Sequence, residues 1–540
     1  MMAGGKYVLG NTGNAGVDMV GNSLTLGLIA GGWNVAAGNN INLQEVRNPN
    51  GMFNTVGSSS VKHLFNYAPT DYVNLTAGNG VLLGETTSTA FRVDSFTIPQ
   101  IYPSILSIMA GAGGLGFLCD ATYRQMVLYA SPYGGLTINT TDGGGIYNRT
   151  LNGAIPTSGT SPLLFSLIVS DSPDRQYLNN TSFLGTDGTG DHGATPVHLN
   201  SEQPVTLNIS GDVNRFTLIS SEAATVNVGG NLKNSRFQGM NLRSTDVTTI
   251  NVTGDINDRS AFTSIDISTI NGAAAPDLSV LGRSQDSVLT PGVLLASLYY
   301  DSTTHLFTYQ NIQAGNLTLS QILTKLQHLV VQSVDAHGNL LYNADGSPVT
   351  EVVSVLNATT ANALLAASNA QGGLPNDTSG LAIGGGGTFK VSARNINFGN
   401  TAGIVSKGAG LYNVNGYYPL AALFTTGPKI VVDASGNIDM LASTISSLNG
   451  GDIYVNADGY INVGSSQFTV NTTGARGIFS TGQGNVAVYA GGDINLNGSR
   501  IAVYDTRPAQ SGVPTPGGSL TVVSRNGDVI VGGGGSGSVV

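Results

Sequence analysis

The chain has 540 residues, of which 75 are glycine and only 54 are charged (22 Lys+Arg and 32 Asp+Glu). Charged residues make up 10 % of it, against about 25 % in an ordinary globular protein. The formal net charge of −10 argues against a nucleic-acid-binding protein, because phosphates attract clustered Lys and Arg. The hydrophobic content of 41 % is enough to bury a large core, so disorder driven by charge is also excluded.

The amino terminus and the single cysteine carry little functional signal. Residues 1–7 lack a charged start followed by an apolar run, so no signal peptide is expected there. The longest apolar stretch, residues 105–118, is interrupted by glycine and serine and is too short to span a bilayer. Cys119 excludes an intrachain disulfide, and an inert thiol is favoured over a nucleophile because no histidine accompanies it in the sequence.

One phrase recurs along the chain: a short alternating strand, a corner of glycine with Asp or Asn, and a second alternating strand. Ile, Val and Leu alternate in it with Asn and Thr, which predicts strands with one buried and one solvated face. Such strands are too short to bury a core alone. In chain order the copies are residues 32–43, 71–83, 205–213, 225–232, 249–256, 451–463, 484–496 and 518–531.

The corners of this phrase are predicted to be structural. Glycine adopts a positive φ at low cost there, and an Asp or Asn side chain bonds the local backbone. A carboxylate that returns at each corner indicates structure, because an active site occurs once. The corner residues are Gly211 and Asp212, Gly254 and Asp255, Gly451 and Asp452, Gly492 and Asp493, and Gly527 and Asp528.

A corner every eight or nine residues, repeating at about 20 to 25 residues, is typical of a coil of three short strands. Stacked coils pair each strand with its counterpart about 4.8 Å away, which makes a parallel β-helix, an all-β solenoid. A β-propeller is the alternative, but no regular period of about 40 to 50 residues is found. At about 22 residues per turn, the sequence predicts roughly 20 turns and a rod near 100 Å long.

The middle of the chain breaks this pattern, which divides it into three parts. Residues 1–285 are predicted to form β-helix with long loops, residues 286–376 a small α/β insertion, and residues 377–540 the C-terminal coils. In the insertion, residues 318–330 show helical spacing with Thr318 as N-cap, and residues 358–371 predict a second helix. Turn signals between them predict a hairpin over residues 334–349. We expect the insertion to pack on the side of the rod.

Metal and cofactor sites have weak support. The loop around Asp187, Asp191 and His192 gathers oxygen ligands of the kind calcium prefers. It lacks the bidentate Glu of an EF-hand and the nonapeptide of calcium β-rolls, so a solvated loop is favoured. No cofactor is predicted.

An enzyme is the alternative function, since many parallel β-helices cleave polysaccharides. A lyase or glycosidase would need paired carboxylates, or Lys or Arg beside carboxylates, on neighbouring coils. The carboxylates found here are those of the repeated corners, so we predict no enzymatic activity. A contact-dependent toxin would need a catalytic carboxyl-terminal domain, and residues 532–540 offer none.

The repeated phrases resemble the filamentous haemagglutinin family of large bacterial exoproteins, the secreted partners of two-partner secretion systems. The resemblance covers most of the chain outside the insertion and is densest near the carboxyl end. It is carried by residues 167–173, 245–256, 389–399, 403–404, 450–459 and 491–501.

The resemblance implies a right-handed parallel β-helix fibre that is exported through an outer-membrane β-barrel transporter and is then secreted or displayed on the outer cell surface. It implies an adhesin that contacts host or bacterial surface glycans and receptors. The family's export domain follows a signal peptide, and residues 48–51 only echo one of its motifs, so we expect an internal or carboxyl-proximal fragment. Open end coils predict end-to-end self-association.

Overall fold

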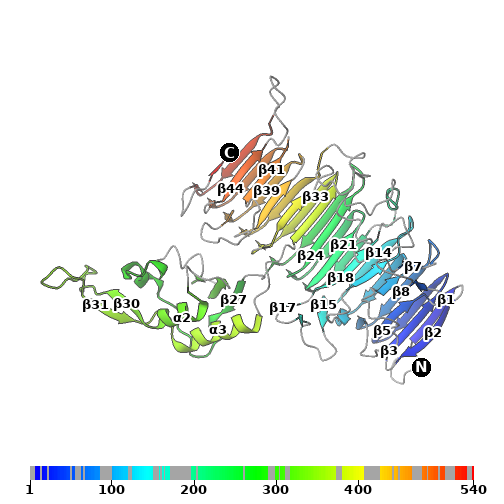
Figure 1. The fold of residues 1–540 in the computed structure, drawn as a ribbon, viewed down its shortest axis with the longest axis horizontal. Coiled ribbons are helices and arrows are strands. Elements are labelled where there is room, and N and C mark those ends of the chain that lie inside the picture. The colour runs from blue at the N-terminus through cyan, green and yellow to red at the C-terminus, as the bar shows by residue number, and fades with distance from the viewer. Residues whose placement is uncertain are drawn as a thin grey trace.

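The chain forms a rod of stacked strands with a smaller unit at one side (Figure 1). In this computed structural model the described residues are 7–12, 15–20, 23–48, 52–54, 62–64, 67–84, 100–118, 125–149, 157–158, 161–162, 164–170, 196–201, 203, 205–258, 262–289, 298–302, 305–310, 317–371, 380–399, 401–406, 426–440, 443–447, 450–464, 477–482, 484–496, 499–504, 517–531 and 538–539.

Three long sheets run along the rod. Sheet 1 contains, in spatial order, β1 (Tyr7–Thr12), β4 (Gly32–Ala37), β8 (Tyr72–Ala77), β11 (Ile105–Ala110), β14 (Gly135–Thr140), β19 (Val205–Ile209), β22 (Ala224–Val228), β25 (Val247–Val252), β33 (Thr388–Ala393), β36 (Lys429–Ala434), β39 (Ile453–Ala457), β42 (Val486–Ala490) and β45 (Leu520–Ser524).

Sheets 2 and 3 follow the same order of coils. Sheet 2 contains β2 (Ala15–Val20), β3 (Ser23–Leu28), β5 (Asn40–Arg47), β9 (Gly80–Leu83), β12 (Gly114–Leu118), β15 (Ile146–Arg149), β20 (Val213–Asn214), β23 (Leu232–Lys233), β26 (Ile256–Asn257), β34 (Ile396–Asn397), β37 (Ile438–Asp439), β40 (Ile461–Asn462), β43 (Ile494–Asn495) and β46 (Val529–Ile530). Sheet 3 contains β10 (Gln100–Tyr102), β13 (Gln125–Leu128), β18 (Phe165–Val169), β21 (Phe216–Ser220), β24 (Arg236–Asn241), β32 (Gly380–Gly385), β35 (Gly403–Ser406), β38 (Thr444–Ser447), β41 (Gly477–Thr481), β44 (Arg500–Tyr504) and β47 (Ser538–Val539).

The strands within these sheets pair in parallel from coil to coil, so the predicted parallel β-helix is confirmed. At the amino-terminal end β1 pairs antiparallel with β4, and β2 pairs antiparallel with β3. Of the 13 strands of sheet 1, all but β1 are stacked in parallel, so the described part of the chain contains 12 coils and is about 50–60 Å long. The expected twenty turns were wrong, because loops between strands lengthen many coils well beyond 22 residues.

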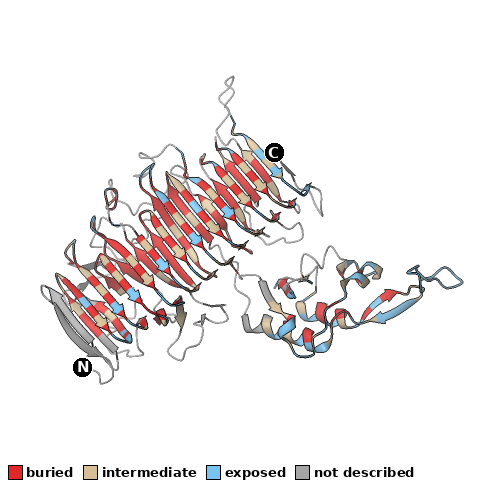
Figure 2. Cartoon of the chain, turned by 180° about the vertical axis from the view of Figure 1, so that it is seen from behind, coloured by how far each residue is buried: buried red, intermediate tan, exposed pale blue. Residues whose placement is uncertain are grey.

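Alternation along the strands of sheet 1 places the core inside the rod. In β19, Val205, Leu207 and Ile209 are buried while Thr206 and Asn208 face outward. The same banding of buried and more exposed residues repeats along the rod (Figure 2). Parallel register stacks like on like, so Phe165 of β18 pairs with Phe216 of β21. Phe117 of β12 packs on both rings across the core, with centroid distances of 4.1 and 5.6 Å. Burial of each large apolar side chain stabilises the fold by about 1.5–3 kcal/mol, which makes this continuous stack the main source of stability.

The three corners of the coil differ in how much chain they hold. At corner 1–2, between sheets 1 and 2, only two to five residues join the strands in every coil. Corner 2–3 varies from a single residue, between β20 and β21, to the segment of residues 258–379, and corner 3–1 includes the segment of residues 170–204. Insertions are therefore confined to two of the three edges of the rod.

Close approach of neighbouring coils explains several glycines of corner 1–2, though not Gly492. A Cβ built on Gly211 would overlap the carbonyl oxygen of Gly143, and one on Gly111 would overlap that of Gly78. Gly211 does not have a positive φ, so the expected conformational reason was wrong for it. The absence of a side chain there lets two coil backbones touch.

The insertion forms a lateral unit, residues 262–371, with a core of its own that shares no residue with the core of the rod. It contains β27 (Phe262–Asp266), the 3-10 turns η2 (Ile267–Thr269), η3 (Leu278–Arg283) and η4 (Ser287–Leu289), β28 (Leu298–Asp301), β29 (Leu306–Gln310), α2 (Leu319–Gln327), β30 (Leu329–Gln332), β31 (Thr350–Val353) and α3 (Ala358–Gln371). Two further pairs of short strands, β6 (Met52–Asn54) with β7 (Lys62–Leu64) and β16 (Thr157–Ser158) with β17 (Ser161–Pro162), lie in loops.

The lateral unit begins earlier than the predicted residue 286. The strand β27 pairs antiparallel with β29 and so belongs to this unit, although its alternation resembles that of a coil strand. Both predicted helices and the hairpin between them are present, with Thr318 in a capping box at the start of α2. No helix among the described ranges is long and apolar enough to cross a membrane.

We expect Gly211→Ala to lower the free energy of unfolding by about 1–3 kcal/mol, because the added methyl group forces two coils apart. Gly492→Ala is the matched control: the nearest atom to its Cβ is 3.6 Å away, so its effect should stay within about 0.5 kcal/mol. Urea unfolding followed by circular dichroism measures both. Equal losses in the two variants would contradict the close-approach argument.

Candidate functional site

The predicted corner residues fall on two edges of the rod. Asp212, Asp255, Asp493 and Asp528 lie at corner 1–2, and Asp452 lies at corner 3–1, before β39. The structure thus brings the first four into one line along the rod and separates the fifth from them.

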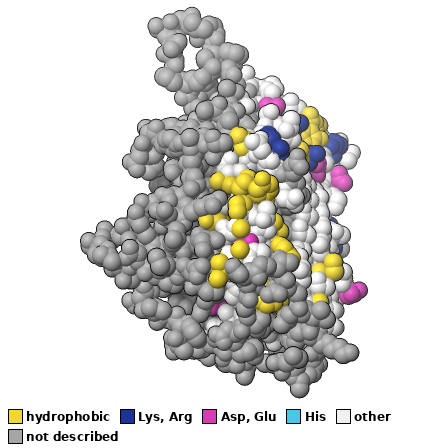
Figure 3. Space-filling model, turned by 90° about the vertical axis from the view of Figure 1, so that its right-hand side faces the viewer, with side chains coloured by type: hydrophobic (Ala, Val, Ile, Leu, Met, Phe, Trp, Pro, Cys, Tyr) yellow, Lys and Arg dark blue, Asp and Glu magenta, His cyan; other side chains and the backbone are white. Residues whose placement is uncertain are grey.

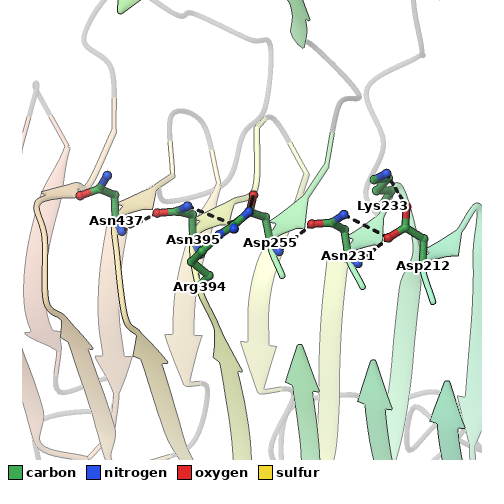
Figure 4. A network of polar contacts seen from close by, with 7 residues as sticks. All are labelled: Asp212, Asn231, Lys233, Asp255, Arg394, Asn395 and Asn437. Atoms are coloured by element: carbon green, nitrogen blue, oxygen red, sulfur yellow. Dashed lines mark hydrogen bonds and ion pairs between the residues drawn. The ribbon is translucent and has the colours of Figure 1, made fainter. Parts of the chain in front are cut away.

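At corner 1–2 the carboxylates belong to a continuous corner ladder, formed by Asp212, Asn231, Asp255, Asn395 and Asn437 (Figure 4). Each side-chain oxygen accepts a hydrogen bond from the backbone N–H at the equivalent position of the next coil. The Asn231 N–H donates to Asp212 Oδ1 at 2.7 Å, and the Asp255 N–H donates to Asn231 Oδ1 at 2.9 Å. The ladder satisfies corner N–H groups that the short strands of sheet 2 leave without a partner.

Two cations neutralise the carboxylates of the corner ladder. Arg394 binds Asp255 through both oxygens, at 2.9 and 2.8 Å, and Lys233 Nζ lies 2.6 Å from Asp212 Oδ2. Burial by itself raises the pKa of Asp255, but the bonds from Arg394 and Asn395 outweigh it and hold that pKa below its usual range. The pKa of Asp212 is lowered in the same way, against burial, by Lys233 and Asn231.

The other predicted aspartates repeat this geometry. Asp452 Oδ1 accepts from the Asn485 N–H at 2.8 Å, and Asn485 Oδ1 accepts from the Ser519 N–H at 2.8 Å. Asp493 Oδ1 accepts from the Asp528 N–H at 2.9 Å. The hydrogen bonds of Asp212, Asp255, Asp452 and Asp493 therefore join one coil to the next, which supports a structural role.

A second ladder follows the outer face of sheet 1. The amides of Asn139, Asn208, Asn227 and Asn251 bond one another in series, at 2.9, 2.8 and 3.0 Å. Ser392 extends the series by donating to Asn251 Oδ1 at 2.8 Å. Stacked asparagines of this kind add polar contacts between identical positions of successive strands. In Figure 3 the described Lys, Arg, Asp and Glu side chains stand in small groups of both signs.

Sequence reasoning missed one buried titratable pair, His198 and Glu222. His198 Nδ1 lies 3.7 Å from Glu222 Oε1, and His198 Nε2 lies 3.1 Å from the Ser170 carbonyl oxygen. Their side chains are 1 % and 8 % exposed. Because they are buried between coils, they can stabilise the packing of the coils but cannot contact a polymer substrate. No spacing rule could find it, because loops of unequal length separate the two residues.

The lateral unit holds a cavity of about 320 Å³ between η3, α2 and the β30–β31 hairpin. Its charged groups are paired: Lys325 with Asp286, and Arg283 with Glu351 at 3.1 Å. The two cations that line the cavity, Lys325 and Arg283, are therefore each bound to a carboxylate.

The part of the chain that the structure describes contains no geometric candidate for a metal site. Within the described residues, no three His, Cys, Asp or Glu side chains form a group that could hold an ion. The calcium candidates Asp187, Asp191 and His192 lie outside the described residues, as does Cys119.

In comparisons with known proteins, no family model, no curated protein and no solved structure matches the chain.

We expect Asp255→Ala to lower the free energy of unfolding at pH 7 by about 1–3 kcal/mol, because it leaves the Asn395 N–H unsatisfied and Arg394 unpaired. Asp255→Asn keeps the acceptor, as Asn231 does naturally, and should cost less. Since the folded-state pKa of Asp255 is lowered, its contribution is present above about pH 4 and is lost as the pH falls below that value. Urea titrations at pH 7 and pH 3 measure both effects; equal losses at the two pH values would contradict the assignment.

For Asp439 of β37 we expect the free energy of unfolding to depend on pH in the opposite direction. It aligns with Asn397 on one side and Asn462 on the other, and burial raises its pKa to about 6 despite a bond from Asn462. The folded state therefore binds its proton more tightly than the unfolded state, and stability falls as the pH rises from about 4 to about 6. Asp439→Asn should raise the free energy of unfolding by about 1–2 kcal/mol at pH 7.5 and leave it nearly unchanged at pH 4. A gain of equal size at both pH values would exclude titration as its cause.

Proposed function

We propose that this chain is a structural and adhesive segment of a secreted bacterial exoprotein of the filamentous haemagglutinin type. In this proposal the rod is exported through an outer-membrane β-barrel transporter and then contacts host or bacterial surface glycans and receptors from outside the cell. The parallel β-helix is the single observation that carries the proposal, since it is the fold that the resemblance implies.

Two further features support an adhesive rod over a polysaccharide-cleaving enzyme. Four corner carboxylates accept backbone hydrogen bonds from the neighbouring coil: those of Asp212, Asp255, Asp452 and Asp493. These bonds suit a residue that joins two coils better than a general acid or base. The outward faces of sheet 1 carry mostly Asn, Thr and Ser, whose amides and hydroxyls suit hydrogen bonding to surface polymers.

Adhesion of purified protein tests this proposal directly. Beads coated with the full chain should bind cultured epithelial or bacterial cells above beads coated with albumin, and soluble chain should compete. In parallel, a panel of polysaccharides is incubated with the chain and assayed for new reducing ends. Cell binding without cleavage supports the proposal, whereas cleavage that Asp212→Asn or Asp255→Asn abolishes in a folded protein would overturn it in favour of the enzyme.

A further inference from the structure

The outer face of sheet 1 changes character near the carboxyl end of the rod. On β19 and β22 the outward positions hold Thr and Asn, whereas β39 and β42 place Tyr454 and Tyr489 there. The register pairs Tyr454 with Ala487 and Asn456 with Tyr489, so the two rings stand on diagonal positions of neighbouring coils. Their centroids are 5.5 Å apart and the ring planes are inclined by 39°. Both side chains are half-buried.

A cation and an amide flank these rings. The Arg525 guanidinium lies 6.0 Å from the Tyr489 centroid, and its Nη2 donates to Asn456 Oδ1 at 2.7 Å. Arg525 is exposed, and a guanidinium has five N–H donors, of which this bond uses one. The contact fixes the edge of an aromatic platform that we define as Tyr454, Asn456, Tyr489 and Arg525.

The chemistry of this platform favours a sugar over a protein surface. A protein partner of ordinary size needs an interface of about 800 Å² per side with an apolar centre, and here two rings stand among Ala487, Thr521 and the exposed Asp433. A pyranose ring presents one face of C–H groups, which packs on an aromatic face, and a rim of hydroxyls, which bond to planar amide and guanidinium groups. The short side chains of Ala487 and Thr521 leave the Tyr454 ring accessible from the next coils.

We propose that Tyr454 and Tyr489 bind a saccharide by stacking, with Asn456 and Arg525 bonding its hydroxyls. This site rests on the proposed adhesive function and gives it a location on the last coils of sheet 1.

The experiment uses the full chain on a printed oligosaccharide array, followed by calorimetric titration of the strongest-binding saccharide. Tyr454→Ala and Tyr489→Ala should each weaken binding by about tenfold, because each removes one stacking surface. Tyr454→Phe and Tyr489→Phe keep the rings and should retain most of the affinity. Arg525→Gln, in an exposed side chain, should weaken binding without unfolding the protein.

Tyr72→Ala is the matched control: Tyr72 also faces outward on sheet 1 and its hydroxyl oxygen accepts from Asn34 Nδ2 at 3.1 Å, but it lies on β8 near the other end of the rod.

The outcomes separate this site from the wider proposal. Loss of binding in the alanine variants and in Arg525→Gln, with melting temperatures like that of the parent, supports the platform. Saccharide binding that the platform variants leave unchanged, or that Tyr72→Ala lowers equally, overturns the site while adhesion to glycans stands. Should the alanine variants unfold, undiminished binding in Arg525→Gln overturns it. An array without any bound saccharide overturns the site, and the bead assay then reports separately on adhesion.

Discussion

Parallel stacking of coils at a spacing of about 4.8 Å is the constraint on which the rest of the molecule depends. Each strand must meet its equivalent above and below, so each side chain meets a neighbour at the same position of the next coil. Apolar residues then form a continuous interior, and polar residues at the corners form ladders such as the one from Asp212 to Asn437. A carboxylate in such a ladder is surrounded by donors from the adjacent coil, which is why the pKa values of Asp212 and Asp255 are lowered although burial opposes it.

The sequence reveals this architecture because its signals are local. Period-two alternation in segments such as residues 205–209, followed by a glycine and an Asp or Asn, is sufficient to predict the strands, corner 1–2 and parallel stacking. The number of coils is not readable in the same way, since long segments such as residues 170–204 interrupt the period. The predicted start of the lateral unit, residue 286, lies after its true start because β27 alternates like a coil strand. Only the antiparallel pairing of β27 with β29 distinguishes it from one.

The features of the candidate site depend on which residues the stacking brings together. Asp212 and Asp255 were predicted as structural corners, but Asn395 joins their ladder across 140 residues of sequence that include the whole lateral unit. The pairing of His198 with Glu222 and the approach of Arg525 to Tyr489 likewise depend on loop lengths that no motif encodes. The proposed function therefore rests on this geometry and on the phrases that resemble the exoprotein family.

The three corners of the coil differ in how long an insertion they accept, so variation in segment length is concentrated on two edges of the rod. At corner 1–2 the backbones of neighbouring coils touch and side chains hydrogen-bond from coil to coil. This edge cannot accept even a methyl group at positions such as Gly211. The other two edges accept anything from a single residue to a folded unit with its own core. Whole folded segments can therefore be added, exchanged or grafted on two sides of the rod while its length and its core stay as they were.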